Sequence, residues 1–314
     1  MLTVIGEALI DVVSRADREP VRHPGGSPMN VALGLARLGH PVRFLGAWGN
    51  DDDGQLLAHH LGAEGIELPL PTHDSATSVA EAVIGENGAA EYNFQMTWEF
   101  PVEQANLEAM VKDSTALHVG SIATVLEPGA ANVVKAVEAA AGHVLVTYDP
   151  NCRPQITADV EQVRTRAELL ASHADVVKAS DEDLQWLYPT STLQESARAW
   201  HRLGAKMVVV TRGDLGPWAI TEATGQEGVE VPARRTDVVD TVGAGDTFMA
   251  ALISQFADRG LEGPGAGEGI AALETAEVEN ILRRAADAAA ITVSRAGADL
   301  PRRHELDALA ESSD

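Results

Sequence analysis

The sequence predicts an α/β fold in which a mostly parallel sheet is covered by helices, with a small β-unit inserted into it. Two patterns carry this prediction. From residue 101 onward, short apolar segments alternate with longer segments in which apolar residues recur at helical spacing. Around residues 77–96 the pattern changes to two extended segments that flank an Asn-Gly pair, which is typical of a β-hairpin.

The first elements follow from apolar runs and capping signals. A strand is expected at residues 2–6, and a polar stretch follows at 14–24. Ser27 is a favoured N-cap residue and Pro28 a favoured first helical residue, so a helix is expected to begin there and to end at Gly39. Further along, the pattern indicates a strand at 42–48 and a helix at 51–61.

The inserted β-unit is expected to have strands at 77–84 and 90–96 and a turn at 86–88. In its second strand apolar residues alternate with polar ones, so one face of the sheet should be apolar. The apolar positions are Tyr92, Phe94 and Met96.

Beyond residue 101, strands and helices alternate. Strands are expected at 116–120, 144–149, 176–179 and 207–211. Helices are expected at 128–141, 160–172, 193–203, 246–257 and 278–293. A second hairpin is indicated at 218–221 and 229–231, and the Gly-rich polar segment 259–276 is interpreted as a surface loop.

Length and composition exclude several classes of protein and partner. The 314 residues allow one large domain or two modest ones. The 23 Lys and Arg residues against 47 Asp and Glu give a net charge of −24, which argues against nucleic acid or an anionic membrane as partner. The single cysteine, Cys152, allows no internal disulfide and fits a reducing compartment. We expect a cytoplasmic protein, because no basic signal region or membrane-length apolar run is found.

The segment DTVGAGDTF at residues 240–248 carries the clearest chemical signal. Small residues at 243–245 let the backbone approach a ligand closely, and the helix that follows offers free N–H groups and a positive dipole end. This combination predicts an anion site. Asp246, in the first turn, would then take a proton from an attacking hydroxyl. The same residues also fit an ordinary glycine turn with an aspartate favourable to the helix dipole.

Two other segments could add polar groups to such a site. GGSPMN at 25–30 is a second Gly-rich entry to a helix, and Asn30 can both donate to and accept from sugar hydroxyls. Glycines before a capped helix are also common without a ligand. DPNCR follows a strand, and, if it is extended, Asp149, Asn151 and Arg153 point to one side, with Arg153 available for a phosphate. A turn held by side-chain hydrogen bonds is the alternative.

Several familiar motifs are not found. The sequence has no G-x-x-x-x-G-K-[ST], no G-x-S-x-G and no H-E-x-x-H, so P-loop, serine hydrolase and zincin chemistry lack support. A doubly wound dehydrogenase is disfavoured because no G-x-G-x-x-G follows the first strand.

The motifs that are present resemble those of the PfkB (ribokinase-like) carbohydrate kinases over nearly the whole chain. GGSPMNVA at 25–32 is similar to the family's N-terminal signature, and DTVGAGD at 240–246 to its highly specific C-terminal signature. Supporting matches follow in the family's order: GEALID at 6–11, GNDDDG at 49–54, DPNCR at 149–153, KASDED at 178–183, TRGDLG at 211–216 and SRAGA at 294–298. The resemblance implies a three-layer ribokinase-like α/β/α domain (1–11, 25–74 and 101–314) and a small β-sheet lid (12–24 and 75–100).

The resemblance also implies ATP-dependent transfer of a phosphoryl group to a sugar hydroxyl. Asp246 would be the catalytic base and Arg153 would contact the sugar or the transferring phosphate. The backbone N–H groups of the anion hole would come from Gly243, Ala244 and Gly245. The sugar would be held by Asp11, Gly25, Gly26, Asn30, Phe94 and Asn151. The nucleotide would lie along Lys178, Ser180, Thr211, Gly213 and Gly216.

Metal ions enter through the same resemblance. Many relatives use Mg²⁺ with the nucleotide, and many are activated by K⁺ near the anion hole. The resemblance implies Asp183 as a residue for Mg²⁺ and Asp240 as a ligand of K⁺. The chain departs from the family pattern at two places, with Ser180 to Asp183 where relatives often have Asn-x-x-Glu, and Ala286-Asp287 where they often have Asn-Ala.

Among relatives, the resemblance is strongest to fructokinases, through the opening GEALID, the run YDPNCRP and the late RAGAD. We therefore expect D-fructose to be converted to fructose 6-phosphate, with 2-keto-3-deoxygluconate or ribose as the alternative substrate. A sugar-binding sensor without catalysis is a further alternative, which the presence of Asp246 disfavours. Many relatives are dimers, and an isolated small hairpin pair with one apolar face is unstable. We therefore also expect a homodimer through the β lid.

Overall fold

The computed structural model describes residues 1–15, 18–84 and 90–311. Within these residues, the main sheet has eight strands in the order β12-β11-β10-β9-β8-β7-β1-β4. The strands from β10 to β4 run parallel, while β11 and β12 are antiparallel additions at one edge. Their bounds are β1 Leu2–Ile5, β4 Val42–Leu45, β7 Ala116–Gly120, β8 Leu145–Asp149, β9 Val176–Ser180, β10 Met207–Thr211, β11 Trp218–Thr221 and β12 Val229–Glu230.

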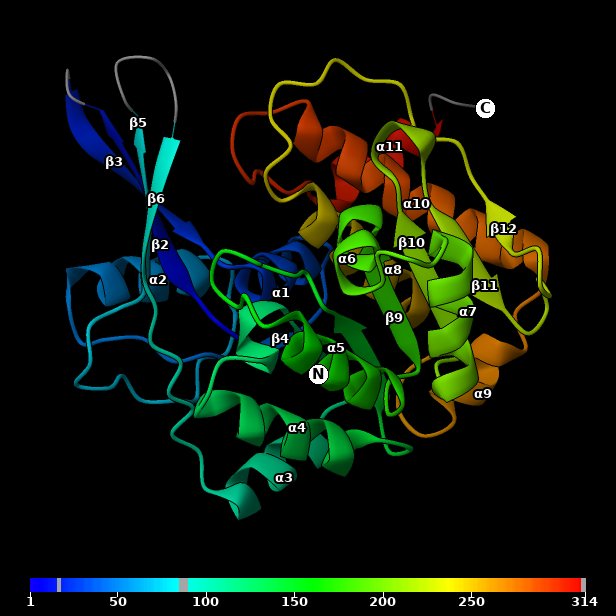
Figure 1. The fold of residues 1–314 in the computed structure, drawn as a ribbon, viewed down its shortest axis with the longest axis horizontal. Coiled ribbons are helices and arrows are strands. Elements are labelled where there is room, and N and C mark those ends of the chain that lie inside the picture. Colours follow the sequence, from blue (N-terminus) through cyan, green and yellow to red (C-terminus); the bar gives the residue numbers. More distant parts are fainter. Residues whose placement is uncertain (16–17, 85–89, 312–314) are drawn as a thin grey trace.

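Helices cover both faces of this sheet and give three layers (Figure 1). One core cluster includes apolar residues of α1 (Ser27–Arg37), α2 (Asp52–Gly62), α8 (Ala244–Ala257), α9 (Ala266–Ala271), α10 (Thr275–Val293) and α11 (Arg303–Glu311). The other includes those of α3 (Gln104–Lys112), α4 (Gly129–Ala140), α5 (Val160–Ala171), α6 (Asp181–Leu187) and α7 (Leu193–Leu203). The predicted α/β fold class is confirmed.

The central strands are apolar over most of their length because both of their faces are covered. In β10, Met207 and Val209 belong to the first core cluster, whereas Val208 and Val210 belong to the second. Alternate side chains point to opposite faces of a strand, so a continuous apolar run supplies both clusters.

A second, four-stranded sheet has the order β3-β2-β5-β6 and stands beside the main body, next to α2 (Figure 1). Its strands are β2 Leu9–Arg15, β3 Arg18–Gly25, β5 Val79–Ile84 and β6 Ala90–Gln95. The strand β2 begins before residue 12, where the lid was expected to begin. Within the polar stretch 14–24, residues 18–24 lie in β3. The turn predicted at 86–88 lies outside the described residues.

Some local predictions were wrong. The N-cap of α1 is Gly26, not Ser27, and Ser27 is the first helical residue. The segment 259–276 is not only a loop, because α9 forms within it and buries Ile270 fully. The helices α3, α6 and α11 were not predicted; α6 has only seven residues, too few to show a helical repeat.

The parallel strands place their carboxyl ends at one edge of the main sheet, which is where open α/β sheets bind ligands. Gly6, Asp149, Ser180 and Thr211 end or follow strands at this edge. Among the described residues, no helix combines the length and the apolar character that crossing a membrane requires.

Candidate active site

Asp246 lies in the first turn of α8 and is only 7% exposed. Its carboxylate accepts hydrogen bonds from Ser27 Oγ at 2.7 Å and from Asn30 Nδ2 at 2.8 Å, both on the first turn of α1. Asn151 Nδ2 donates a third, longer bond of 3.4 Å from the loop after β8. Three segments that are far apart in the sequence therefore meet at one carboxylate. Two of these segments are the Gly-rich helix entries of the sequence, at residues 25–30 and 240–248.

The entry to α8 places backbone N–H groups beside this carboxylate. Gly243 is the N-cap residue, with a left-handed φ of 76°, and no side chain caps the helix. The Ala244 amide donates to Thr241 O at 3.3 Å. The amides of a helix's first turn have no acceptor within the helix, so this entry offers donors and a positive dipole end to an anion.

The glycine at 243 is required by its conformation and by its neighbour. A Cβ on Gly243 would lie 2.7 Å from Ala298 Cβ, closer than real Cβ contacts come. The Ala298 loop is itself tied to the helix entry, because Asp240 Oδ2 accepts from the Gly297 amide at 2.9 Å. Asp240 Oδ1 accepts from the Val242 amide at 3.0 Å. These backbone bonds lower the pKa of Asp240, so it is ionised at neutral pH.

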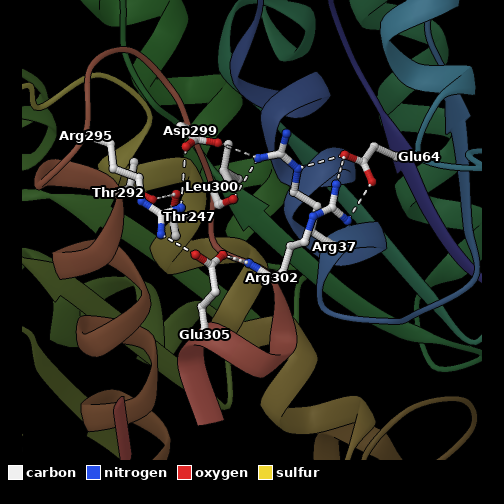
Figure 2. A network of polar contacts seen from close by, with 9 residues as sticks. All are labelled: Arg37, Glu64, Thr247, Thr292, Arg295, Asp299, Leu300, Arg302 and Glu305. Atoms are coloured by element: carbon white, nitrogen blue, oxygen red, sulfur yellow. Dashed lines mark hydrogen bonds and ion pairs between the residues drawn. The ribbon is translucent and has the colours of Figure 1, made fainter. Parts of the chain in front are cut away.

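A network of hydrogen bonds and ion pairs contacts the loop that contains Ala298, at Asp299 and Leu300 (Figure 2). Arg37, at the end of α1, donates to Leu300 O at 2.7 Å and to Asp299 Oδ1 at 3.0 Å. Glu64 bridges Arg37 and Arg302 at 3.0 and 2.8 Å. The network joins the chain after α10 to α1 and to the segment after α2, and so fixes the loop against which Gly243 packs.

The predicted sugar residue Asp11 projects from β2 opposite His23 of β3. Gly25 makes room for it, since a Cβ there would lie 2.1 Å from Asp11 Oδ2. Asp11 is exposed, and partial loss of hydration among the surrounding residues raises its pKa to about 6, although His23 and Arg153 pull it down. Phe94, on β6 of the same sheet, is half-buried and stacks on Tyr92 with ring centroids 6.1 Å apart.

The chain after β8 forms a turn, which is one of the two alternatives that the sequence left open. Asn151 has a positive φ of 37°, and its amide donates to Asp149 Oδ1 at 3.2 Å, which closes a turn. Asp149 is fully buried, Asn151 faces Asp246, and Arg153 is exposed. These three side chains therefore do not share one side, and the alternative of a turn held by side-chain hydrogen bonds is correct. Arg153 Nη1 donates to the carbonyl oxygen of Cys152 at 3.0 Å.

Two residues assigned to the nucleotide and its metal are occupied by protein contacts. Asp183 Oδ1 accepts from the Cys152 amide at 2.7 Å, and Asp183 Oδ2 accepts from the amide and hydroxyl of Ser180 at 2.8 and 2.7 Å. This is a capping box that begins α6 and fastens the loop after β8 to it. Within the described residues, no three His, Cys, Asp or Glu side chains gather as a metal site. The Mg²⁺ role of Asp183 stays a prediction.

The remaining nucleotide candidates follow β10. Thr211 ends this strand, and the short 3₁₀ turn Gly213–Leu215 leads to Gly216. A Cβ on Gly216 would lie 2.1 Å from Val231 O, so close backbone packing excludes a side chain there. The sheet topology puts this turn at the same edge as Asp149 and Ser180. Contact with ATP at these positions stays a prediction.

Two residues of the site were not recognised in the sequence. Ser27 was interpreted as an N-cap, and this interpretation hid its hydrogen bond to Asp246. Glu7 is 5% exposed, and its Oε2 accepts from the Ala123 amide at 3.1 Å. A glutamate directly after an apolar strand was the available signal, because an ionisable group at such a depth needs specific partners.

Burial raises the pKa of Glu7 from 4.5 to about 7, despite hydrogen bonds from Ser121 and Ala123. The folded state therefore binds a proton that the unfolded state releases. This contribution to stability is complete below about pH 4.5 and is lost as the pH rises through about 7. We expect Glu7→Gln to raise the free energy of unfolding, relative to wild type, more at pH 8.5 than at pH 5.5.

Urea unfolding of both proteins at the two pH values measures this difference. A difference that is independent of pH, or that is larger at pH 5.5, would contradict the assignment of a protonated Glu7.

Comparisons with known proteins identify the family of the chain. The sequence matches the pfkB family carbohydrate kinase description over residues 1–305. A fructokinase of Rhizobium leguminosarum bv. trifolii is 33% identical over 260 residues, which cover 81% of this chain and 79% of that protein. A fructokinase of Xylella fastidiosa with bound ATP has a TM-score of 0.88 and 26% identity, covering 100% of this chain and 99% of the other.

A fructokinase of Vibrio cholerae O395, solved in its fructose, ADP and calcium ion bound form, has a TM-score of 0.78 and 25% identity. The similarity covers 98% of this chain and 97% of that one. Family match, sequence similarity and fold similarity all extend over most or all of the chain. The chain therefore belongs to the pfkB family of carbohydrate kinases, which are phosphotransferases with an alcohol group as acceptor.

Proposed function

We propose that this protein is an ATP-dependent fructokinase that converts D-fructose to fructose 6-phosphate. One observation carries the proposal: a buried aspartate, Asp246, lies in the first turn of an uncapped helix, beside backbone amides suited to an anion. A carboxylate next to a phosphate site is unfavourable unless it accepts a proton during the reaction. The fructokinase relatives support the choice of sugar.

In the proposed reaction, the sugar hydroxyl loses its proton to Asp246 as its oxygen forms a bond to the γ-phosphorus of ATP. The bond from that phosphorus to the β,γ-bridging oxygen breaks, and ADP leaves. Amides of Gly243, Ala244 and Gly245 stabilise the charge on the transferring group, and the Ala244 amide exchanges its long bond to Thr241 O for the phosphoryl group. Ser27, Asn30 and Asn151 orient the base through their hydrogen bonds to it.

Mg²⁺ is proposed to enter with the phosphates of ATP, whose charge it neutralises. In the sugar site, Asp11, Gly25, Gly26, Asn30, Phe94 and Asn151 are proposed to contact the sugar, and Arg153 the sugar or the transferring group. The β lid is proposed to join two copies of the chain. Its Tyr92 is 53% exposed although it belongs to the predicted apolar face.

Fructose is preferred over a sugar acid because Asp11 is negatively charged above its pKa of about 6. Its carboxylate accepts hydroxyl hydrogen bonds and repels a second carboxylate. We expect a higher kcat/KM for D-fructose than for D-ribose, 2-keto-3-deoxygluconate or adenosine in a coupled ADP-release assay. A clear preference for 2-keto-3-deoxygluconate would replace the substrate assignment and leave the kinase assignment standing.

Potassium is proposed to act at Asp240. The carboxylate fits a cation that binds oxygen, because it is ionised and its two oxygens offer about four lone-pair sites, of which the Val242 and Gly297 amides use one on each oxygen. An ion there would fix the loop that precedes the anion hole. We expect turnover to fall when tetramethylammonium replaces K⁺, and Asp240→Ala to remove this dependence. Equal rates in the two salts would contradict the potassium proposal.

A further inference from the structure

A buried ion pair lies next to Gly245 of the anion hole, and the proposed chemistry does not use it. Lys178 Nζ donates to Asp149 Oδ2 at 2.7 Å, and the two side chains are 4% and 1% exposed. The residues belong to neighbouring parallel strands, β9 and β8, at the edge of the sheet where the site lies. Burial is the largest single influence on the pKa of Lys178 and lowers it. Attraction to Asp149, the hydrogen bond to it, and the charges of Asp183 and Asp246 together leave the pKa raised, so the amine stays charged.

The pair lies next to both segments that are proposed to position the reacting groups. A Cβ on Gly245 would lie 3.1 Å from Lys178 Nζ, so the amine lies next to this residue of the anion hole and limits the space for a side chain there. On the other side, Asp149 Oδ1 accepts from the Asn151 amide at 3.2 Å and so closes the turn that aims Asn151 Nδ2 at Asp246. One ion pair thereby connects the α8 entry to the loop after β8.

Stability alone does not explain such a pair. Removing two charges from water costs several kcal/mol per ion, and apolar residues of similar volume often replace a buried ion pair without loss of stability. A cation at the N-terminal end of a helix is also unfavourable to the helix dipole. Both unfavourable terms, the loss of hydration and the cation near the helix N-terminus, are explained if the pair holds the α8 entry and the Asn151 turn in place.

We propose that Lys178, through Asp149, is a positioning residue that holds the Gly243–Gly245 amides and Asn151 in register with Asp246. The inference rests on the proposed kinase function. It gives Lys178 a role through the protein and not through direct contact with ATP, to which the sequence resemblance had assigned it.

The test compares Lys178→Met with the double variant Lys178→Met/Asp149→Asn. The single variant leaves a buried carboxylate without its cation, so its melting temperature should fall. The double variant is neutral, and its side-chain amide oxygen at position 149 can still accept from the Asn151 amide, so its melting temperature should recover. We expect its kcat with D-fructose to remain about 10- to 100-fold below wild type, with KM values for sugar and ATP changed little.

Arg43→Met is the matched control. Among the described residues, Arg43 and Lys178 are the buried Arg and Lys side chains, and Arg43 pairs with Glu67 at 3.0 Å away from the α8 entry. Its loss should lower the melting temperature without lowering kcat. A double variant that regains wild-type kcat together with its melting temperature would overturn the positioning role.

Amide hydrogen exchange gives a readout that does not depend on turnover. In the folded double variant the side chain at position 149 is no longer held by Lys178, so its bond to the Asn151 amide should open more often. Peptides covering 150–153 and 240–248 should therefore exchange faster than in wild type, while peptides of the remaining core stay unchanged. Unchanged exchange in both peptides would refute the inference whatever the substrate is. Failure of the proposed function would instead be seen as an inactive wild-type enzyme.

Discussion

Asp246→Asn should lower kcat by about 100- to 10,000-fold, which is the usual contribution of a general base. The amide cannot take the proton of the sugar hydroxyl, and its oxygen still accepts the bond from Ser27 or Asn30. The melting temperature and the affinity for ATP should therefore change little. Steady-state kinetics with D-fructose, thermal unfolding and nucleotide titration measure the three quantities.

Asp175→Asn is the matched control for this variant. Asp175 is a half-buried carboxylate whose Oδ2 accepts from the Val146 amide at 2.9 Å. It directly precedes β9, at the amino ends of the parallel strands and therefore away from the site. Its replacement should affect stability and leave kcat near wild type. Asp246→Asn with kcat within a few-fold of wild type would show that another group is the base.

Gly243→Ala should have the second largest effect. At φ 76°, an alanine costs roughly 1–2 kcal/mol in backbone strain, and its Cβ would meet Ala298 at 2.7 Å. Relief of this contact must move the α8 entry, whose amides are proposed to bind the transferring phosphoryl group. Because loss of one such donor typically costs about 100- to 1,000-fold in kcat, we expect a decrease of that order.

Gly265→Ala is the control that separates the effect of backbone strain from the effect of displacing the α8 entry. Gly265 is the N-cap of α9 with a similar φ of 83°, and a Cβ added there would meet nothing within 4 Å. Both variants should lose some melting temperature, but only Gly243→Ala should lose turnover. Similar kcat values for the two variants would exclude the anion-hole role of the α8 entry.

The sequence predicts the layers of the fold well because its signals are local. Residues 207–210 of β10 are apolar at every position and supply both core clusters, and the small residues at 243–245 precede a long apolar helix. The sequence predicts the polar contacts poorly because they join distant segments. The bond from Ser27 to Asp246 spans 219 positions, and no local pattern distinguishes it from a cap.

The burial of polar side chains was also hard to infer from the sequence. The assignment of Lys178 to ATP stays a prediction. The sequence did not indicate that this side chain is buried against Asp149, because the register of β8 and β9 sets the two residues side by side. The sequence allowed either a turn or an extended chain at Asn151. Only the fold distinguishes them, through the hydrogen bond from the Asn151 amide to buried Asp149.

The central claim is sugar-dependent phosphoryl transfer, and the most direct measurement is ADP release by the wild-type protein with and without D-fructose. The product is identified by ³¹P NMR. We predict ADP formation that requires the sugar, with one fructose 6-phosphate formed for each ADP. ADP release that is independent of every sugar offered, or a sugar that binds without any ADP release, would contradict the account.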